Sequence, residues 1–161
     1  MDNLYRRIED FLYYECELLD QWKMEEWASL FTEKGKYLIP PIGNPEADET
    51  KSLYLVHDDH ARLTQRAKRL LRKEAHVEYP HSNVVHNLHN IRLKDYDEEN
   101  GRLLVRCNFT AYRTKREMLD SYVGVLEYTL VLEENELKIE EKKVILKLDS
   151  LRPQGKISFI L

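Results

Sequence analysis

Cysteine is scarce in this sequence of 161 residues, which contains only Cys16 and Cys107. A chain of this length can bury a core of ordinary size without disulfide staples. The two cysteines lie far apart, each on an apolar stripe, where a free cysteine usually packs as a small buried hydrophobe. We therefore predict that both are reduced core residues of a single domain that spans residues 1–161.

Glycine is also rare, and none of the five glycines belongs to a glycine-rich phosphate loop or to a Gly-x-Ser-x-Gly turn. Neither cysteine has a histidine next to it in the sequence. The sequence therefore gives no positive evidence for nucleotide binding or for nucleophilic catalysis.

Long apolar runs are missing, because no stretch approaches the ~20 apolar residues of a membrane span. Residues 1–6 also lack the basic segment followed by an apolar run that a signal peptide requires. We expect a soluble, cytoplasmic protein that has no membrane partner.

Positive charge is not in excess, since 25 lysines and arginines face 29 aspartates and glutamates and give a net charge of -4. Such a chain has no global field that attracts nucleic acid or anionic lipid. One basic patch lies between Arg62 and Lys73, but it has no interleaved aromatic residues for stacking on bases. We interpret it as a surface or protein-docking face and expect no nucleic-acid partner.

Apolar residues recur every three or four positions in the first part of the chain, which predicts helices. The first predicted helix begins at Asn3, a short second helix covers residues 24–31, and a third covers residues 57–73. At the start of the third, Asp58 and Asp59 stand where carboxylates complement the helix dipole.

A short extended segment is predicted between the second and third helices. Gly35 breaks the helical pattern, and residues 36–39 then read as a strand that two prolines close. The proline-rich and polar residues 40–52 are predicted to form a loop of the domain and not a linker between domains.

After Pro80 the apolar period falls to two, which predicts a sheet over the second half of the chain. Residues 103–111 and 122–132 each alternate and have one strongly apolar face. Polar turns are predicted at residues 97–101, 114–117 and 133–135. In the last strand the apolar residues change parity near Glu141, which requires a bulge or a sharp bend there.

These elements predict an α+β fold in which a curved, mainly antiparallel mixed sheet wraps over three N-terminal helices. This is the cone or half-barrel of cystatin-like and ketosteroid-isomerase-like proteins. The same fold hosts enzymes, binding proteins and structural subunits, so it does not decide the function.

Metal binding is not favoured by the six histidines. His86 and His89 are an odd number apart on a predicted strand, so their side chains point to opposite faces unless a bulge intervenes. His57 and His60 have no cysteine or third histidine nearby to complete a zinc set. We predict no metal site and no cofactor in this chain.

A pocket inside the cone is the remaining candidate for chemistry. There an aspartate, a histidine and tyrosines could act as acid and base on a small molecule. The candidates are Asp20, Tyr37, His86 and Tyr128. Each could equally have an ordinary structural role, since buried histidines and tyrosines are often packed with their polar atoms tied to neighbours.

Several segments together resemble the small subunits of bacterial aromatic-ring-hydroxylating dioxygenases. The opening is similar at E-C-E-L-L-D (15–20), W-A-S-L-F (27–31) and Y-L-I-P (37–40). The later similar segments are Asp58–Asp59 with Leu63, Arg66 and Arg69–Leu70; Pro80–Ser82 with His86 and Asn90–Ile91; and Gly155–Leu161. They are spread over nearly the whole chain, in the family's order and spacing. The chain departs from the family pattern at Asn83 and Val85, where arginines are usual.

The resemblance implies an oxygenase of three large and three small subunits, in which this chain is a structural, non-catalytic β subunit. The large subunit would carry the Rieske iron-sulfur cluster and the mononuclear iron. A Rieske centre needs Cys-x-His and Cys-x-x-His motifs, which this sequence lacks. Two alternatives stay open: a free-standing cone-fold dehydratase or isomerase, and a small-ligand binding protein.

Overall fold

The computed structural model describes residues 2–72, 81–152, 154 and 157–161. Its helices are α1 (Asp2–Asp20), α2 (Met24–Ala28) and α3 (His60–Leu70). Its strands are β1 (Phe31–Ile39), β2 (Val56–Asp58), β3 (Asn83–Asp97), β4 (Arg102–Lys115), β5 (Met118–Glu133) and β6 (Glu136–Leu146).

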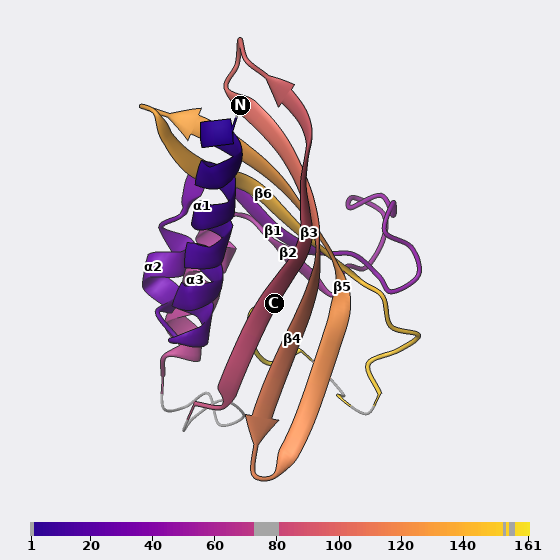
Figure 1. Ribbon diagram of the computed structural model, residues 1–161. Coiled ribbons are helices and arrows are strands. Elements are labelled where there is room, and N and C mark those ends of the chain that lie inside the picture. The colour runs from indigo at the N-terminus through magenta and orange to yellow at the C-terminus, as the bar shows by residue number, and fades with distance from the viewer. Residues whose placement is uncertain (1, 73–80, 153, 155–156) are drawn as a thin grey trace.

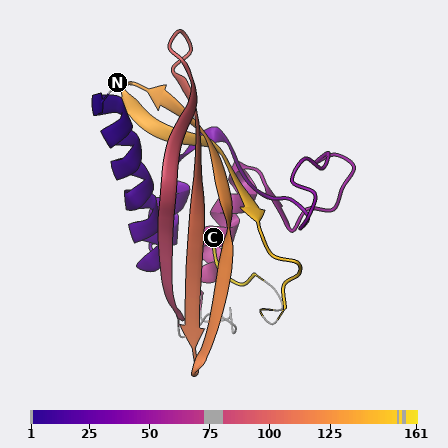
Figure 2. The same ribbon diagram turned by 45° about the vertical axis from the view of Figure 1, so that its right-hand side comes forward.

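The six strands form one open, mixed sheet in the order β2-β1-β6-β5-β4-β3. Strands β3 to β6 are a continuous antiparallel meander, β2 is antiparallel to β1, and β1 joins the sheet through a parallel pairing with β6. Figures 1 and 2 show the long strands twisting across the molecule, with the three helices gathered on one face. The predicted α+β fold, a curved mixed sheet over three N-terminal helices, is confirmed.

Helix α1 forms because its apolar residues make a stripe that the sheet can cover. Ile8, Leu12 and Leu19 are fully buried, and the helix packs against β3. Burying side chains of this size contributes roughly 1.5–3 kcal/mol each. The helix ends before Trp22, whose φ of 59° turns the chain and whose indole N–H donates to the carbonyl oxygen of Ser82 at 2.9 Å.

The predicted boundary between the second helix and the first strand is wrong. Helix α2 ends at Ala28, and β1 starts at Phe31, which pairs with Ile139 of β6. Gly35 lies inside β1, at an irregularity between Phe31 and Lys36. A Cβ on Gly35 would stand 2.8 Å from the Cβ of Phe31, so this close backbone approach requires glycine. Residue 31 is therefore in a strand, because its pairing with β6 outweighs the helical spacing of the neighbouring apolar residues.

The third helix is also shorter than predicted. Residues 56–58 pair with β1 as strand β2, and α3 begins only at His60. Asp59 is the N-cap and accepts a hydrogen bond from the backbone N–H of Arg62 at 2.9 Å. The side chain of Asp58 instead binds the guanidinium of Arg66 at 2.5 Å. The helix also ends earlier than predicted, at Leu70 with Leu71 as its C-cap, and residue 73 itself lies outside the described residues.

The predicted irregularity in the last strand is confirmed. Thr129 pairs with Glu141 and Leu130 pairs with Ile139, so Glu140 is an extra residue in β6. This bulge keeps the apolar residues on both sides of it facing the core. A second bulge, which the sequence did not indicate, occurs in β3 where Asn90 has a φ of 56°.

Residues 157–161, here called the tail, turn back into the interior of the cone. Phe159, Ile160 and Leu161 are almost fully buried in the main hydrophobic cluster. Figures 1 and 2 place the end of the chain against the middle of the sheet. The apolar segment is therefore removed from water within its own chain. In the described ranges, no helix combines the length and the apolar character needed to cross a bilayer.

Candidate functional site

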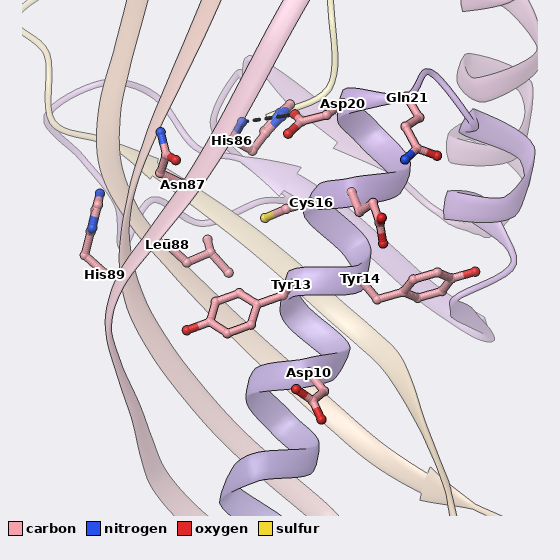
Figure 3. Close-up of a pocket in the computed structure, with 11 residues that line it drawn as sticks. Asp10, Tyr13, Tyr14, Cys16, Asp20, Gln21, His86, Asn87, Leu88 and His89 are labelled. Atoms are coloured by element: carbon pink, nitrogen blue, oxygen red, sulfur yellow. Dashed lines mark hydrogen bonds and ion pairs between the residues drawn. The ribbon is translucent and has the colours of Figure 1, made fainter.

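Asp20 and His86 form a hydrogen-bonded pair between α1 and β3, at the edge of the cone interior. Asp20 is the last residue of α1, and the side chain of His86 on β3 faces it. One carboxylate oxygen of Asp20 is 2.6 Å from Nδ1 of His86 and accepts the backbone N–H of His86 at 3.0 Å (Figure 3). Two hydrogen bonds therefore fix the end of α1 to β3. β3 pairs with β4 without a register shift from Asn83 to His89, so the side chains of His86 and His89 point to opposite faces of the strand, as predicted.

The second ring nitrogen of His86 faces the tail. Nε2 lies 2.7 Å from the carbonyl oxygen of Ile160, and the ring of Phe159 packs edge-on at a centroid distance of 5.9 Å. Both ring nitrogens of His86 therefore face hydrogen-bond acceptors, the carboxylate of Asp20 and the carbonyl of Ile160. In this arrangement no ring nitrogen of His86 is left to act on a bound small molecule.

The two predicted tyrosines lie deeper in the same interior. The hydroxyl oxygen of Tyr37 accepts the backbone N–H of Leu161 at 3.1 Å, and the hydroxyl of Tyr128 donates to Glu15 at 2.6 Å. Burial raises the pKa of Tyr37 and raises that of Tyr128 well above its usual value. Both hydroxyls therefore stay neutral and act as hydrogen-bond partners.

Glu15 and Lys142 are the polar residues at this site that sequence reasoning missed. Their side chains are almost completely buried and form an ion pair of 2.6 Å. Glu15 also accepts from the indole N–H of Trp27 at 2.9 Å, and Lys142 also donates to the carbonyl oxygen of Leu161 at 2.6 Å. Each buried charge is thus compensated by an opposite charge and by further hydrogen bonds.

A signal for both residues was present in the sequence. Glu15 stands on the apolar stripe of α1, between Leu12 and Leu19, where a charged residue is out of place. Lys142 has the same parity as Val144 and Leu146, which face the core. A polar residue of each sign at core positions indicates a buried pair, although only the fold shows that the two meet.

The four predicted pocket residues therefore belong to two hydrogen-bonded groups that both contact the tail. Asp20 and His86 form one, through the carbonyl of Ile160. Tyr37 contacts Leu161, and Tyr128 belongs to the Glu15–Lys142 group, which also contacts Leu161. Among the described residues, no group of three histidine, cysteine or carboxylate side chains could hold a metal ion.

An open groove of about 730 Å³ lies outside this interior, between α1 and β3. Asp20 and His86 form one end of it, and Tyr13 and Leu88 lie along its length (Figure 3). Tyr13 is about half exposed. The acid–base pair therefore has its carboxylate near a surface groove, while the imidazole is turned toward the tail.

The two cysteines also border this region. Cys107 is buried on β4, and Cys16 on α1 is only partly covered and lines the groove. Burial raises the pKa of the Cys107 thiol to about 12 and raises that of Cys16. Both thiols are therefore protonated at neutral pH.

We expect both thiols to react slowly, because the thiolate is the reactive form. At pH 8 a thiol with a pKa of about 12 is thiolate in roughly one molecule in 10⁴. Titration with a disulfide reagent at pH 8 should label the folded protein at least a hundredfold more slowly than the protein in denaturant. Labelling of either cysteine at the denatured rate would contradict the buried, protonated state.

A curved mixed sheet over three helices, with its interior closed by the chain's own tail, places this protein in the cystatin-like cone class. An NTF2-like protein with a cystatin-like fold from Novosphingobium aromaticivorans matches with a TM-score of 0.63 and 12% identity, over 94% of this chain and 86% of that one. The structure of naphthalene 1,2-dioxygenase with indole bound matches with a TM-score of 0.83 and 15% identity, over 100% of this chain and 87% of that one. The β subunit of benzoate 1,2-dioxygenase from Burkholderia mallei matches with a TM-score of 0.75 and 24% identity, over 93% of this chain and 95% of that one. These likenesses show the shared fold.

The family is shown by sequence. The family model described as "Ring hydroxylating beta subunit" matches residues 14–153. The small oxygenase component of the p-cumate 2,3-dioxygenase system of Pseudomonas putida is 41% identical over 155 residues, which are 96% of this chain and 85% of that protein. This chain belongs to the β subunits of aromatic-ring-hydroxylating dioxygenases, and the predicted family is confirmed.

Proposed function

We propose that this chain is a structural, non-catalytic subunit that supports a Rieske-type large subunit in an oxygenase for the degradation of aromatic compounds. The observation that favours a structural role is the burial of Phe159, Ile160 and Leu161 in the cone. The tail takes the place that a small substrate would need beside His86 and Tyr37. The rigid block made by the sheet, the helices and the tail is suited to hold a partner in a fixed position.

The redox groups in this proposal belong to the large subunit. The residues that follow Cys16 and Cys107 are Glu-Leu-Leu and Asn-Phe-Thr, so neither cysteine begins a Rieske ligand motif. Donors that fit a Rieske cluster are therefore not supplied by this chain.

A patch on the outer face of the sheet supports assembly with other chains. Val85 on β3 pairs with Tyr112 on β4. Leu119 and Val123 lie on β5, the strand that pairs with β4 on its other side. These side chains are exposed by 37–63%. Adjacent exposed apolar side chains of this kind mark interaction surfaces. We propose that this outer-face patch is buried in a cytoplasmic complex of three small and three large subunits.

Co-expression with a Rieske-type large subunit of this family tests the proposal. The chain alone should elute with a mass near three times 19.3 kDa, and with the large subunit as a mixed hexamer. Tyr112→Lys should reduce assembly, while Leu53→Lys, in a loop where Leu53 is 91% exposed, should leave it unchanged. A monomer that ignores the large subunit would reject the proposal.

The main alternative is a free-standing cone-fold dehydratase, isomerase or ligand-binding protein. The Asp20–His86 pair favours it, because a carboxylate that orients an imidazole is a common acid–base arrangement. That function requires the tail to release Nε2 of His86, which otherwise faces the carbonyl of Ile160. Binding of a small molecule to the full-length chain, with His86 perturbed in its NMR spectrum, would support this alternative.

A further inference from the structure

Residues 159–161 lie in the cone as a bound peptide would lie in a receptor. Three of their main-chain groups meet side chains from three different strands. The carbonyl of Ile160 lies 2.7 Å from the ring of His86 on β3. For Leu161, the N–H donates to Tyr37 on β1 at 3.1 Å and the carbonyl accepts from Lys142 on β6 at 2.6 Å.

Most of these receptor side chains are held in place by contacts that do not involve the tail. The ammonium of Lys142 is fixed by Glu15 at 2.6 Å, and Glu15 is fixed in turn by Trp27 and Tyr128. His86 is fixed by Asp20. Lys142 and His86 are therefore held by partners outside the tail, which lowers the entropic cost of binding it.

The tail is joined to the rest of the fold differently from the other extended segments. The last strand, β6, ends at Leu146, and the described residues between 147 and 161 belong to no helix or strand. The tail is held by side chains and by its apolar residues, and not by a backbone ladder.

We propose that the cone interior is a receptor site for a short apolar peptide segment with main-chain carbonyl acceptors, and that residues 157–161 are its built-in and exchangeable occupant. Recognition depends on the three main-chain contacts and on burial of the Phe159, Ile160 and Leu161 side chains. The site therefore binds the sequence Ile-Ser-Phe-Ile-Leu when it is supplied as a separate molecule.

Cutting the chain after it has folded tests the proposal without requiring a truncated protein to fold. A specific protease site is placed between residues 152 and 157, and the purified full chain is cleaved. The released segment should remain bound through gel filtration. A fluorescent peptide that carries Ile-Ser-Phe-Ile-Leu should then replace it, with an increase in anisotropy that saturates at one peptide per chain.

Changes in the peptide, with the protein unchanged, then distinguish specific recognition from nonspecific hydrophobic binding. Alanine in place of Phe159 should weaken binding by at least a hundredfold. An N-methyl group on Leu161, which removes the donor to Tyr37, should weaken it about threefold to tenfold. In a Tyr37→Phe protein the N-methyl effect should disappear, whereas a Lys143→Met control, on the neighbouring position of β6, should retain it.

Three outcomes would overturn the proposal. The cleaved protein could lose the segment, stay folded and take up no labelled peptide. A scrambled peptide of the same composition could bind equally well. The cleaved protein could unfold when the segment leaves and fail to refold when the peptide is returned, whereas recovery of the folded signal on adding the peptide would support the receptor site.

Discussion

Replacing Lys142 with methionine is expected to lower the free energy of unfolding by about 3–5 kcal/mol. The methionine fills similar space, but it leaves the carboxylate of Glu15 buried without its counter-charge. It also removes the donor to the carbonyl oxygen of Leu161. A buried carboxylate that keeps only the neutral donors of Trp27 and Tyr128 is poorly compensated.

Urea unfolding followed by circular dichroism measures this effect, and Arg102→Met is the matched control. Arg102 pairs with Glu140 on the surface, where its side chain is 51% exposed, and surface pairs contribute about 0–1 kcal/mol. The double variant Glu15→Gln with Lys142→Met should recover part of the loss, because no charge is then left buried. Equal effects of Lys142→Met and Arg102→Met would show that the interior pair is not isolated from water.

Replacing Phe159 with alanine is expected to cost about 3–5 kcal/mol, the usual range for truncating a buried phenylalanine. The ring of Phe159 is 4% exposed and packs edge-on against Tyr122 at 5.3 Å between centroids. It also covers the ring of His86. Removing it would leave a cavity between the tail and the sheet.

Thermal and urea unfolding measure this cost, and Leu53→Ala is the control. Leu53 is 91% exposed in the loop after β1, so its truncation should change stability by no more than about 0.5 kcal/mol. An equally small effect of Phe159→Ala would mean that the tail does not contribute to the core and would remove the basis for a filled cone.

The periodicity of the sequence was sufficient to predict the order of helices and strands because each long element carries its own apolar face. The bulge near Glu141 could be predicted as well, since a regular strand with a change of parity would turn part of its apolar residues toward water. The boundaries of elements that pair with distant strands could not be predicted. Strand β2 and the early start of β1 at Phe31 exist because β1 lies between β2 and β6.

The candidate site shows the same division between local and long-range information. Asp20, His86 and the two tyrosines could be proposed from residue type and predicted position. The hydrogen-bond partner of each residue could not be predicted, because these bonds join residues that are 66 to 124 positions apart. Only the folded chain shows that the tail completes the site by occupying it.

The most direct test of a structural role is the turnover of an aromatic substrate per assembled oxygenase, with wild-type chain and with a His86→Gln variant. A supporting subunit predicts that the variant changes the yield of complex but leaves the turnover number of correctly assembled complex within about twofold. An acid or base in catalysis contributes about 10²–10⁴-fold. A hundredfold loss of turnover in fully assembled, iron-loaded complex would contradict the structural account.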